Sequence, residues 1–308
     1  MLNRDDLLSP SIQDKNAGNS GDQVKHLIYL SLLRELNNRE VNPDVVEAHG
    51  GKGVYVSSHR HLLRSRGLPG YQDSLLGRAQ TACFAEPPAG LGGISGLRLG
   101  EVPYAGSVAM HAQEVKAGRC SSLTILDKDP GVQAILERVV SEPCFSAVHG
   151  RLAIEKQYGD SEQFLLSRLA DGQFGPHHVL HFDPFAFVMS QADLMTRMTY
   201  GRLVQECDSR IGEKALKSAS IFFTWGSNGT AALADLDGNG YDGGIPDGYQ
   251  ALLSLVAPER RIVVVWCWEM YFAQLVIVSA DLKDQLVKRI ETETAVLRPL
   301  LSRLQIVA

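Results

Sequence analysis

The stretch of sequence that decides the fold reads Val45-Val46-Glu47-Ala48-His49-Gly50-Gly51-Lys52-Gly53. Its two apolar residues and the acid after them are typical of the end of a buried strand, and the glycines that follow indicate a tight turn. A glycine-rich turn directly after a strand lets a ligand approach the backbone closely. The same turn without a ligand is the alternative interpretation.

The segments around this stretch alternate between helices and strands. Upstream, Asn19 or Ser20 caps a helix whose apolar positions recur at helical spacing and which ends before Pro43. Downstream, we expect strands at 122–127, 145–148, 178–183 and 219–225, helices at about 130–140, 160–170 and 190–215, a hairpin at about 261–279, and a helix over 281–305. This alternation predicts a doubly wound, mostly parallel α/β sheet with one antiparallel strand from the C-terminal hairpin, a combination typical of Rossmann-like methyltransferases.

The spacing of the glycines narrows the class of ligand. The dinucleotide fingerprint Gly-x-Gly-x-x-Gly is absent from 47–53, so a ligand without phosphate, such as S-adenosylmethionine, suits the turn better. An acid at the end of the next strand accepts hydrogen bonds from ribose hydroxyls in such folds; Asp127 stands there, with Asp129 as the alternative. The usual spacing to this acid is about 20 residues. We therefore expect 54–121 to be a helical insertion.

Composition and length describe an ordinary globular chain. The protein has 308 residues, 44% of them hydrophobic and 21% charged, which predicts a single domain over 1–308 with the insertion inside it. Five cysteines without a Cys-x-x-Cys pair argue against a disulfide framework or a structural zinc site. No secretory signal or apolar run of membrane length is visible, so we expect a cytoplasmic protein that makes no contact with a membrane.

The charge is unevenly distributed along the chain. The net charge of −5 argues against broad, non-specific coating of nucleic acid. Residues 52–67, however, carry Lys52, Arg60, Arg64 and Arg66 and no acid. This stretch indicates either a local face for nucleic-acid phosphates or an ordinary solvated surface.

A candidate catalytic motif, His181-Phe182-Asp183-Pro184-Phe185, follows a predicted strand at the edge where doubly wound sheets bind substrates. One reaction that this motif could serve is methylation of the exocyclic amine of a purine. That amine is a poor nucleophile, because its lone pair is conjugated into the ring. Asp183 and the carbonyl of Pro184 are candidate acceptors for its N–H groups, and they would push electron density toward the nitrogen. Phe185 or Phe187 would stack the base after it flips out. A plain Asp-Pro turn at the end of a strand is the alternative.

Neither of two further features predicts a metal site. Residues 235–242 match the opening half of an EF-hand loop, but position 12, where a bidentate Glu should stand, is Pro246. An acidic surface turn over 235–247 is the preferred interpretation. His111, His177 and His178 are isolated in the sequence, so we expect them in core or surface positions rather than as metal ligands.

Several motifs resemble one family. Residues 16–26, Asn-Ala-Gly-Asn-Ser-Gly-Asp-Gln-Val-Lys-His, resemble the Ala-Gly-Asn-x-x-Asp-x-x-Lys-His signature of the bacterial J-type ribosomal RNA methyltransferases. Residues 47–53 look like that family's Asp-x-His-Ala-Gly-x-Gly motif, and 104–107 look like its Tyr-Pro-Gly-Ser. The order of the predicted elements also matches, so the resemblance covers nearly the whole chain. Where the family has Asp-Pro-Pro-Tyr, this chain has Asp-Pro-Phe-Ala at 183–186.

The resemblance implies an S-adenosylmethionine-dependent enzyme that methylates an amine of an RNA base, with adenine N6 of 23S rRNA as the family's target. It implies a catalytic site at Asp183, Pro184 and Phe185. It implies a cofactor pocket lined by Lys25, His26, Glu47, His49, Gly50, Gly51, Gly53, Ser107, Asp127, His149 and Gly150. The residues we expect to contact RNA are Lys15, Asn16, Arg60, Arg64 and Phe187. Two alternatives stay open, a methyltransferase of a small molecule or peptide and a non-catalytic binding protein of the same fold.

Overall fold

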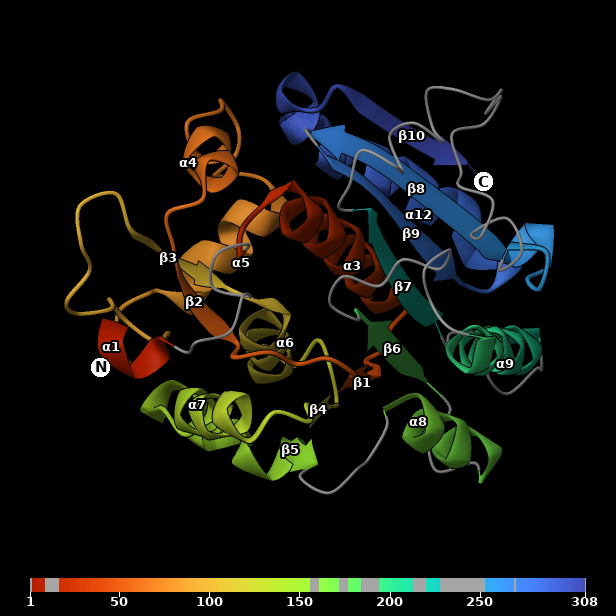
Figure 1. Ribbon diagram of the computed structural model, residues 1–308, viewed down its shortest axis with the longest axis horizontal. Helices are drawn as coiled ribbons and strands as arrows, with labels where there is room; N and C mark the ends of the chain where they lie inside the picture. Colours follow the sequence, from red (N-terminus) through yellow and green to blue (C-terminus); the bar gives the residue numbers. More distant parts are fainter. Residues whose placement is uncertain are drawn as a thin grey trace.

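An eight-stranded sheet crosses the molecule, and helices cover both of its faces (Figure 1). The computed structural model describes residues 2–8, 17–155, 161–171, 177–183, 194–212, 220–227, 253–268 and 270–307. Among the residues singled out by the sequence, Lys15, Asn16, Pro184, Phe185, Phe187 and the turn at 235–247 lie outside these ranges.

The sheet has the strand order β10-β8-β9-β7-β6-β1-β4-β5. Its strands are β1 (Asp44–Glu47), β4 (Ser122–Leu126), β5 (Leu152–Glu155), β6 (His178–Phe182), β7 (Ser220–Ser227), β8 (Arg261–Trp268), β9 (Met270–Ile277) and β10 (Arg303–Val307). Five neighbouring strands of this order pair in parallel, namely β7, β6, β1, β4 and β5. β9 runs antiparallel to both β7 and β8, and β10 runs antiparallel to β8. The predicted mostly parallel, doubly wound sheet is therefore confirmed, with two reversed strands rather than one.

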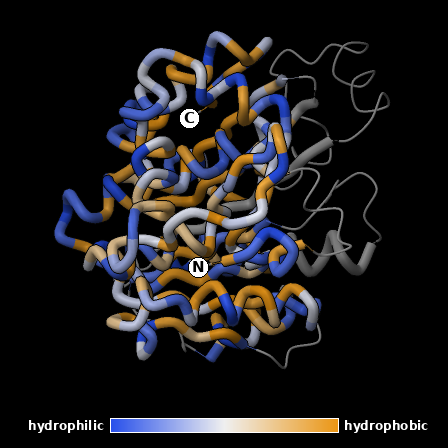
Figure 2. The backbone as a smooth tube through the Cα atoms, turned by 90° about the vertical axis from the view of Figure 1, so that its left-hand side faces the viewer, coloured by the Kyte–Doolittle hydropathy of each residue, from blue (hydrophilic) through white to orange (hydrophobic). Residues whose placement is uncertain are grey.

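The two faces of the sheet bury separate apolar cores, because successive side chains of a strand point to opposite sides. In β1, Val45 belongs to one core and Val46 to the other, and in β8 Val264 and Val265 divide in the same way. The first core also contains residues of α3, α6, α7 and α12, whereas the second contains residues of α8 and α9. Hydrophobic segments accordingly run through the middle of the fold in Figure 2.

Short polar side chains determine where two of these helices begin. α3 (Ser20–Asn38) starts after Asn19, whose side chain accepts the N–H of Asp22 at 3.0 Å. α7 (Pro130–Val140) starts after Asp129, whose Oδ1 accepts the N–H groups of Gly131 and Val132. The other helices on the sheet are α6 (Ser107–Lys116), α8 (Ser161–Ala170), α9 (Leu194–Gly212) and α12 (Ala280–Thr294). The structure thus contains the predicted helix after Asn19 and those near 130–140, 160–170 and 190–215.

Residues 48–121 connect β1 to β4 and form a long segment, which we call the excursion. It holds a two-stranded antiparallel sheet of β2 (Val54–Ser57) and β3 (Val102–Ala105), with α4 (Arg60–Arg66) and α5 (Leu75–Cys83) between them. The segment 54–121 therefore contains strands as well as helices. Its last helix, α6, packs against β1 and β4 and serves as the crossover that two parallel strands require.

Two predicted elements are wrong. The apolar residues 145–148 belong to a 3₁₀ helix, η1 (Pro143–Arg151), and the strand beside β4 begins only at Leu152. The tail does not form one helix over 281–305. Its α-helix ends at Thr294, η4 (Ala295–Leu300) follows, and β10 closes the sheet. Pro299 lies in η4, and a proline cannot continue an α-helix because it lacks the N–H and its ring clashes with the preceding turn.

The N-terminal segment 2–8, which contains α1 (Arg4–Leu7), is fastened to the excursion. The Arg4 guanidinium donates two hydrogen bonds to Glu101, at 2.7 and 2.8 Å. The Leu7 carbonyl accepts a hydrogen bond from Lys52 Nζ at 2.7 Å, and Lys52 is completely buried. Lys52 therefore does not belong to a basic surface. No helix in the described part of the chain is long and apolar enough to cross a membrane.

Candidate active site

The carboxyl ends of β1, β4 and β6 lie at one edge of the sheet, because these three strands are parallel. The strand order reverses between β1 and β6, since β4 lies on the far side of β1 and β7 on the far side of β6. Doubly wound sheets bind their ligands outside the carboxyl ends of the strands at such a switch point. Glu47, Asp127 and Asp183 stand at these three strand ends.

The glycine-rich turn after β1 has a backbone that other residues would not adopt easily. Gly51 and Gly53 have φ angles of 58° and 75°, in the left-handed region that favours glycine. A Cβ on Gly50 would lie 2.4 Å from Cγ2 of Ile125, so a side chain there would displace its neighbour. The N–H of Gly106 donates to the carbonyl of Gly53 at 2.8 Å, which places the start of α6 beside the turn.

Asp127 contacts this turn from the end of β4. Its Oδ2 accepts the N–H of Gly51 at 2.9 Å, and its Oδ1 accepts the N–H of Asp129 at 3.0 Å. Burial raises the pKa of Asp127 above its usual value. Each carboxylate oxygen keeps a lone pair for a further donor such as a hydroxyl. Because the Asp129 carboxylate caps α7, Asp127 is the acid of the two that lies on the turn.

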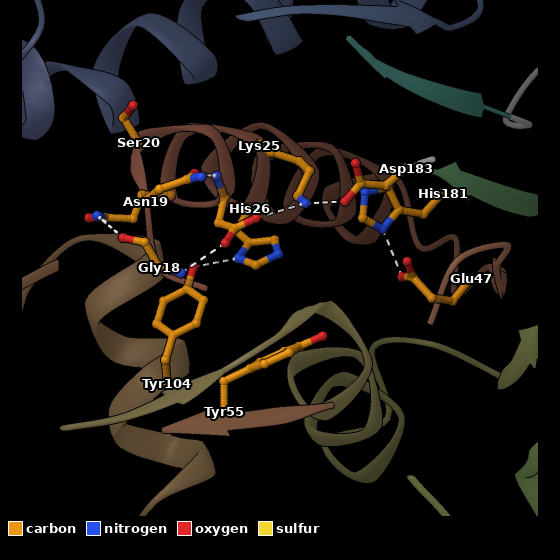
Figure 3. Close-up of polar contacts among 12 residues, drawn as sticks. Gly18, Asn19, Ser20, Lys25, His26, Glu47, Tyr55, Tyr104, His181 and Asp183 are labelled. Atoms are coloured by element: carbon orange, nitrogen blue, oxygen red, sulfur yellow. Dashed lines mark hydrogen bonds and ion pairs between the residues drawn. The ribbon is translucent and has the colours of Figure 1, made fainter. Parts of the chain in front are cut away.

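Lys25 connects α3 to the end of β6. Its Nζ forms a hydrogen-bonded ion pair with Asp183 Oδ2 (Figure 3). A second pair, at 3.1 Å, joins it to Asp22 Oδ1. Burial alone would lower the pKa of this ammonium, but Asp183 and then Asp22 outweigh that effect and raise it. Lys25 is therefore a permanent cation that orients the Asp183 carboxylate at the switch point.

Two histidines lie in the same region. His26 Nδ1 is 2.8 Å from the Tyr104 hydroxyl (Figure 3), and burial, followed by the charge of Lys25, lowers the pKa of His26 well below its usual value. His49 Nε2 lies 3.3 Å from the Ser161 hydroxyl, and burial lowers the pKa of His49 to about 4. His49 Nδ1 has no hydrogen-bond partner among the described residues. Both imidazoles are thus neutral at physiological pH.

Glu47 is fully buried beneath this edge. Its Oε2 lies 2.7 Å from His181 Nδ1 (Figure 3) and 3.1 Å from His111 Nδ1. Burial alone would raise the pKa of Glu47, but the two histidines, His181 foremost, lower it below its usual value. The sequence analysis expected a cofactor contact at Glu47, and the structure places its carboxylate on two imidazoles. The sequence analysis placed His181 only in the motif before Asp183, and it did not connect His111 or His181 with Glu47, because the three residues stand far apart in the sequence.

His149 and Gly150 are not brought to this edge. Both are exposed in η1, before the amino end of β5, and β5 runs parallel to β4. His149 Nε2 lies 2.9 Å from the carbonyl of Val140 instead. Their place in the cofactor pocket was implied by the resemblance, and the strand expected before them over 145–148 is a 3₁₀ helix instead. Ser107, by contrast, is the buried first residue of α6 next to the glycine-rich turn.

Arg60 and Arg64 are exposed on α4. Between them, His61 is buried and stacks on Trp268 at the end of β8, with ring centroids 3.7 Å apart. Arg66 is half-buried and donates to the carbonyl of Pro103 at 2.7 Å. The basic stretch at 52–67 therefore presents a smaller charged surface than its sequence indicates.

The strand order and the reversed strand between β7 and β8 define the class of fold. It is the Rossmann-like α/β fold of the S-adenosylmethionine-dependent methyltransferases.

No family model and no curated protein matches the chain. Among solved structures, it is similar to protein LPL1258 of Legionella pneumophila str. Philadelphia 1, from family DUF519, with 14% identity, a TM-score of 0.58, and coverage of 95% of this chain and 98% of that one. It is also similar to Trm1 of Pyrococcus horikoshii, solved with S-adenosyl-L-methionine, with 11% identity, a TM-score of 0.39, and coverage of 91% of this chain and 62% of that one. The first likeness shows a shared fold, and the second adds nothing to it.

Proposed function

We propose that this protein is an S-adenosylmethionine-dependent methyltransferase that transfers a methyl group to an amine of an RNA base. The observation that carries the proposal is the ion pair between Lys25 and Asp183 at the switch point of the sheet. It holds a carboxylate at the same edge as the glycine-rich turn. A carboxylate in that place can accept a hydrogen bond from an amine that lies next to a cofactor on the turn.

The residues of this edge fit S-adenosylmethionine. The glycines of the turn allow close approach of the backbone, and the Asp127 oxygens keep lone pairs for ribose hydroxyls. The Nδ1 atom of His49, which lacks a hydrogen-bond partner among the described residues, offers one more polar contact. We assign cofactor binding to these residues together with His26 and Ser107.

S-adenosylmethionine would supply an electrophilic methyl group on its sulfonium. The residues of the protein would hold and orient the amine. Asp183 accepts an N–H of that amine and so directs the lone pair of the amine nitrogen, while Lys25 pairs with Oδ2 of the carboxylate. Because the pKa of Lys25 is raised, Asp183 keeps its cationic partner throughout the physiological pH range.

The proposed substrate class, RNA, rests on the resemblance of residues 16–26, 47–53 and 104–107 to the J-type family. Adenine N6 of 23S rRNA is accordingly the first target to test. Arg60 and Arg64 support this choice, because their exposed guanidinium groups can contact phosphates. Such contacts position an RNA without specifying its sequence.

Isothermal titration calorimetry with S-adenosylmethionine tests the cofactor first. The wild-type protein should bind it, Asp127→Ala should lose most of the affinity, and Asp183→Asn should keep it, because Asp183 is assigned to the amine. Asp171→Asn, which changes an exposed acid at the end of α8, is the matched control and should bind as the wild type does. Absence of binding by the wild type would overturn the proposal and favour a non-catalytic binding protein.

Methyl transfer to unmodified 23S rRNA, read as methylated nucleosides by mass spectrometry, tests the substrate. The wild type should form N6-methyladenine, Asp183→Asn should form none, and RNA binding should weaken steeply with salt. A small-molecule or peptide substrate is the second candidate, favoured by the burial of Lys52, which reduces the basic surface of 52–67. Turnover of such a substrate without activity on RNA would replace the RNA assignment.

A further inference from the structure

Glu47, His111 and His181 form a buried cluster beneath the carboxyl edge of the sheet. They come from the end of β1, from α6 and from β6, so three separate elements contribute one side chain each. All three side chains are 0% exposed. One potential ligand atom from each residue can be chosen so that all three atoms lie within 4.8 Å of one another.

One nitrogen of each imidazole lies close to the same carboxylate oxygen. His181 Nδ1 lies 2.7 Å and His111 Nδ1 lies 3.1 Å from Oε2 of Glu47. Tetrahedral zinc holds its nitrogen and oxygen ligands at about 2.0–2.2 Å, which separates neighbouring ligand atoms by about 3.3 Å. A shift of a few tenths of an ångström would therefore bring these two nitrogen–oxygen distances to the spacing of a metal site. The second oxygen, Oε1 of Glu47, has no hydrogen-bond partner among the described residues and can complete the coordination.

The charges at this edge also favour a cation. A buried carboxylate is costly unless an opposite charge compensates it. The nearby ammonium of Lys25 already pairs with two other carboxylates, those of Asp22 and Asp183. Together with Glu47 these groups carry one positive and three negative formal charges. A divalent ion on Glu47 would balance that sum.

We propose that Glu47, His111 and His181 bind one divalent transition-metal ion, with zinc as the first choice. Two imidazoles and one carboxylate form a donor set that zinc uses in proteins. The ion would fasten β1, α6 and β6 together directly below the glycine-rich turn and Asp183. Its role is structural, because the cluster is closed to solvent. The inference does not rest on the proposed methyltransferase function.

Metal analysis of the full-length protein tests the site. The protein is prepared without chelators, freed of any affinity tag, dialysed and analysed by inductively coupled plasma mass spectrometry, with about one ion per chain expected. Glu47→Gln, His111→Gln and His181→Gln should each lose most of the metal. His149→Gln, which removes an exposed histidine bonded to a backbone carbonyl, should keep the wild-type content.

Two measurements on the wild type keep the test independent of how well the variants fold. Refolding with Co²⁺ should give the visible absorption of a tetrahedral nitrogen and oxygen site. Adding a chelator during thermal unfolding should lower the melting temperature, because an ion that binds only the folded state stabilises it. A wild-type protein that holds no stoichiometric metal and gives no cobalt spectrum would overturn the proposal. The cluster would then be a carboxylate hydrogen-bonded to His181, with His111 beside it.

Discussion

Lys25 and Asp183 form an ion pair across 158 residues of sequence, and this contact fastens α3 to the carboxyl end of β6. The Lys25 side chain is 7% exposed and the Asp183 side chain 23% exposed, so one partner is almost buried and the other still reaches solvent. The cation is therefore fixed, while the carboxylate remains accessible to an incoming donor. This asymmetry is what the proposed role of Asp183, as an acceptor that keeps its orientation, requires.

Removal of this cation should destabilise the fold measurably. Lys25→Met leaves Asp22 and Asp183 without their partner and should lower the free energy of unfolding by about 2–3 kcal/mol. Asp183→Asn should cost less, because that side chain is partly exposed. Urea unfolding of both single variants and the double variant should give a coupling energy of about 1–2 kcal/mol. Strictly additive effects would show that the pair contributes nothing to stability.

Gly50 and Gly150 offer a matched pair of substitutions for the glycine-rich turn. Gly50→Ala places a Cβ 2.4 Å from Ile125 and should cost about 1–3 kcal/mol of stability. It should also weaken cofactor binding, because the turn must move. Gly150→Ala meets no atom within 4 Å and should change stability by less than about 0.5 kcal/mol. Equal effects of the two substitutions in calorimetry and urea unfolding would contradict a close-packed turn at Gly50.

The main parts of the fold could be predicted from the sequence where local chemistry and hydrophobic pattern agree. Asn19 and Pro43 bracket an apolar pattern at helical spacing, and the helix formed accordingly. The C-terminal tail, predicted as one helix over 281–305, was predicted wrongly. The apolar positions of β10 continue the helical spacing of α12 by coincidence. Only the sheet edge offered by β8 turns that segment into a strand, and such a partner is not visible in a local window.

Some residues of the candidate site could be predicted from the sequence, and others could not. Asp127 and Asp183 could be predicted, because each stands at the end of an apolar strand and parallel strands bring such ends together. His149 lies away from this edge, and the residues before it form a 3₁₀ helix rather than the expected strand. The cluster at Glu47 could not be predicted, since it depends on packing α6 under two strand ends.

The ion pair between Arg4 and Glu101 should make the anchoring of the N-terminal segment sensitive to acid. The hydrogen bonds from Arg4 lower the pKa of Glu101 from its ordinary 4.5 to about 2. Because the pKa is lower in the folded state, the stabilisation is complete above pH 4.5 and is lost as the pH falls toward 2. Limited proteolysis of residues 2–8 by an acid-active protease should therefore accelerate over this range.

Glu101→Gln should abolish most of that pH dependence, with the segment already loosened at neutral pH. Glu86→Gln, at an exposed position of the same excursion, is the matched control and should keep the wild-type profile. A Glu101→Gln variant with the wild-type profile would mean that another group anchors the segment.

Asp127 and Asp129 stand two residues apart, and their substitution separates cofactor binding from helix capping. Asp127→Asn should reduce the affinity for S-adenosylmethionine by about 10-fold or more, because a neutral amide oxygen accepts hydroxyl hydrogen bonds more weakly than a carboxylate does. Asp129→Ala removes the acceptor for Gly131 and Val132 and should cost about 1 kcal/mol of stability, while affinity changes little. Calorimetry and urea unfolding of both variants measure the two effects. A larger loss of affinity in Asp129→Ala would transfer the ribose assignment from Asp127 to Asp129.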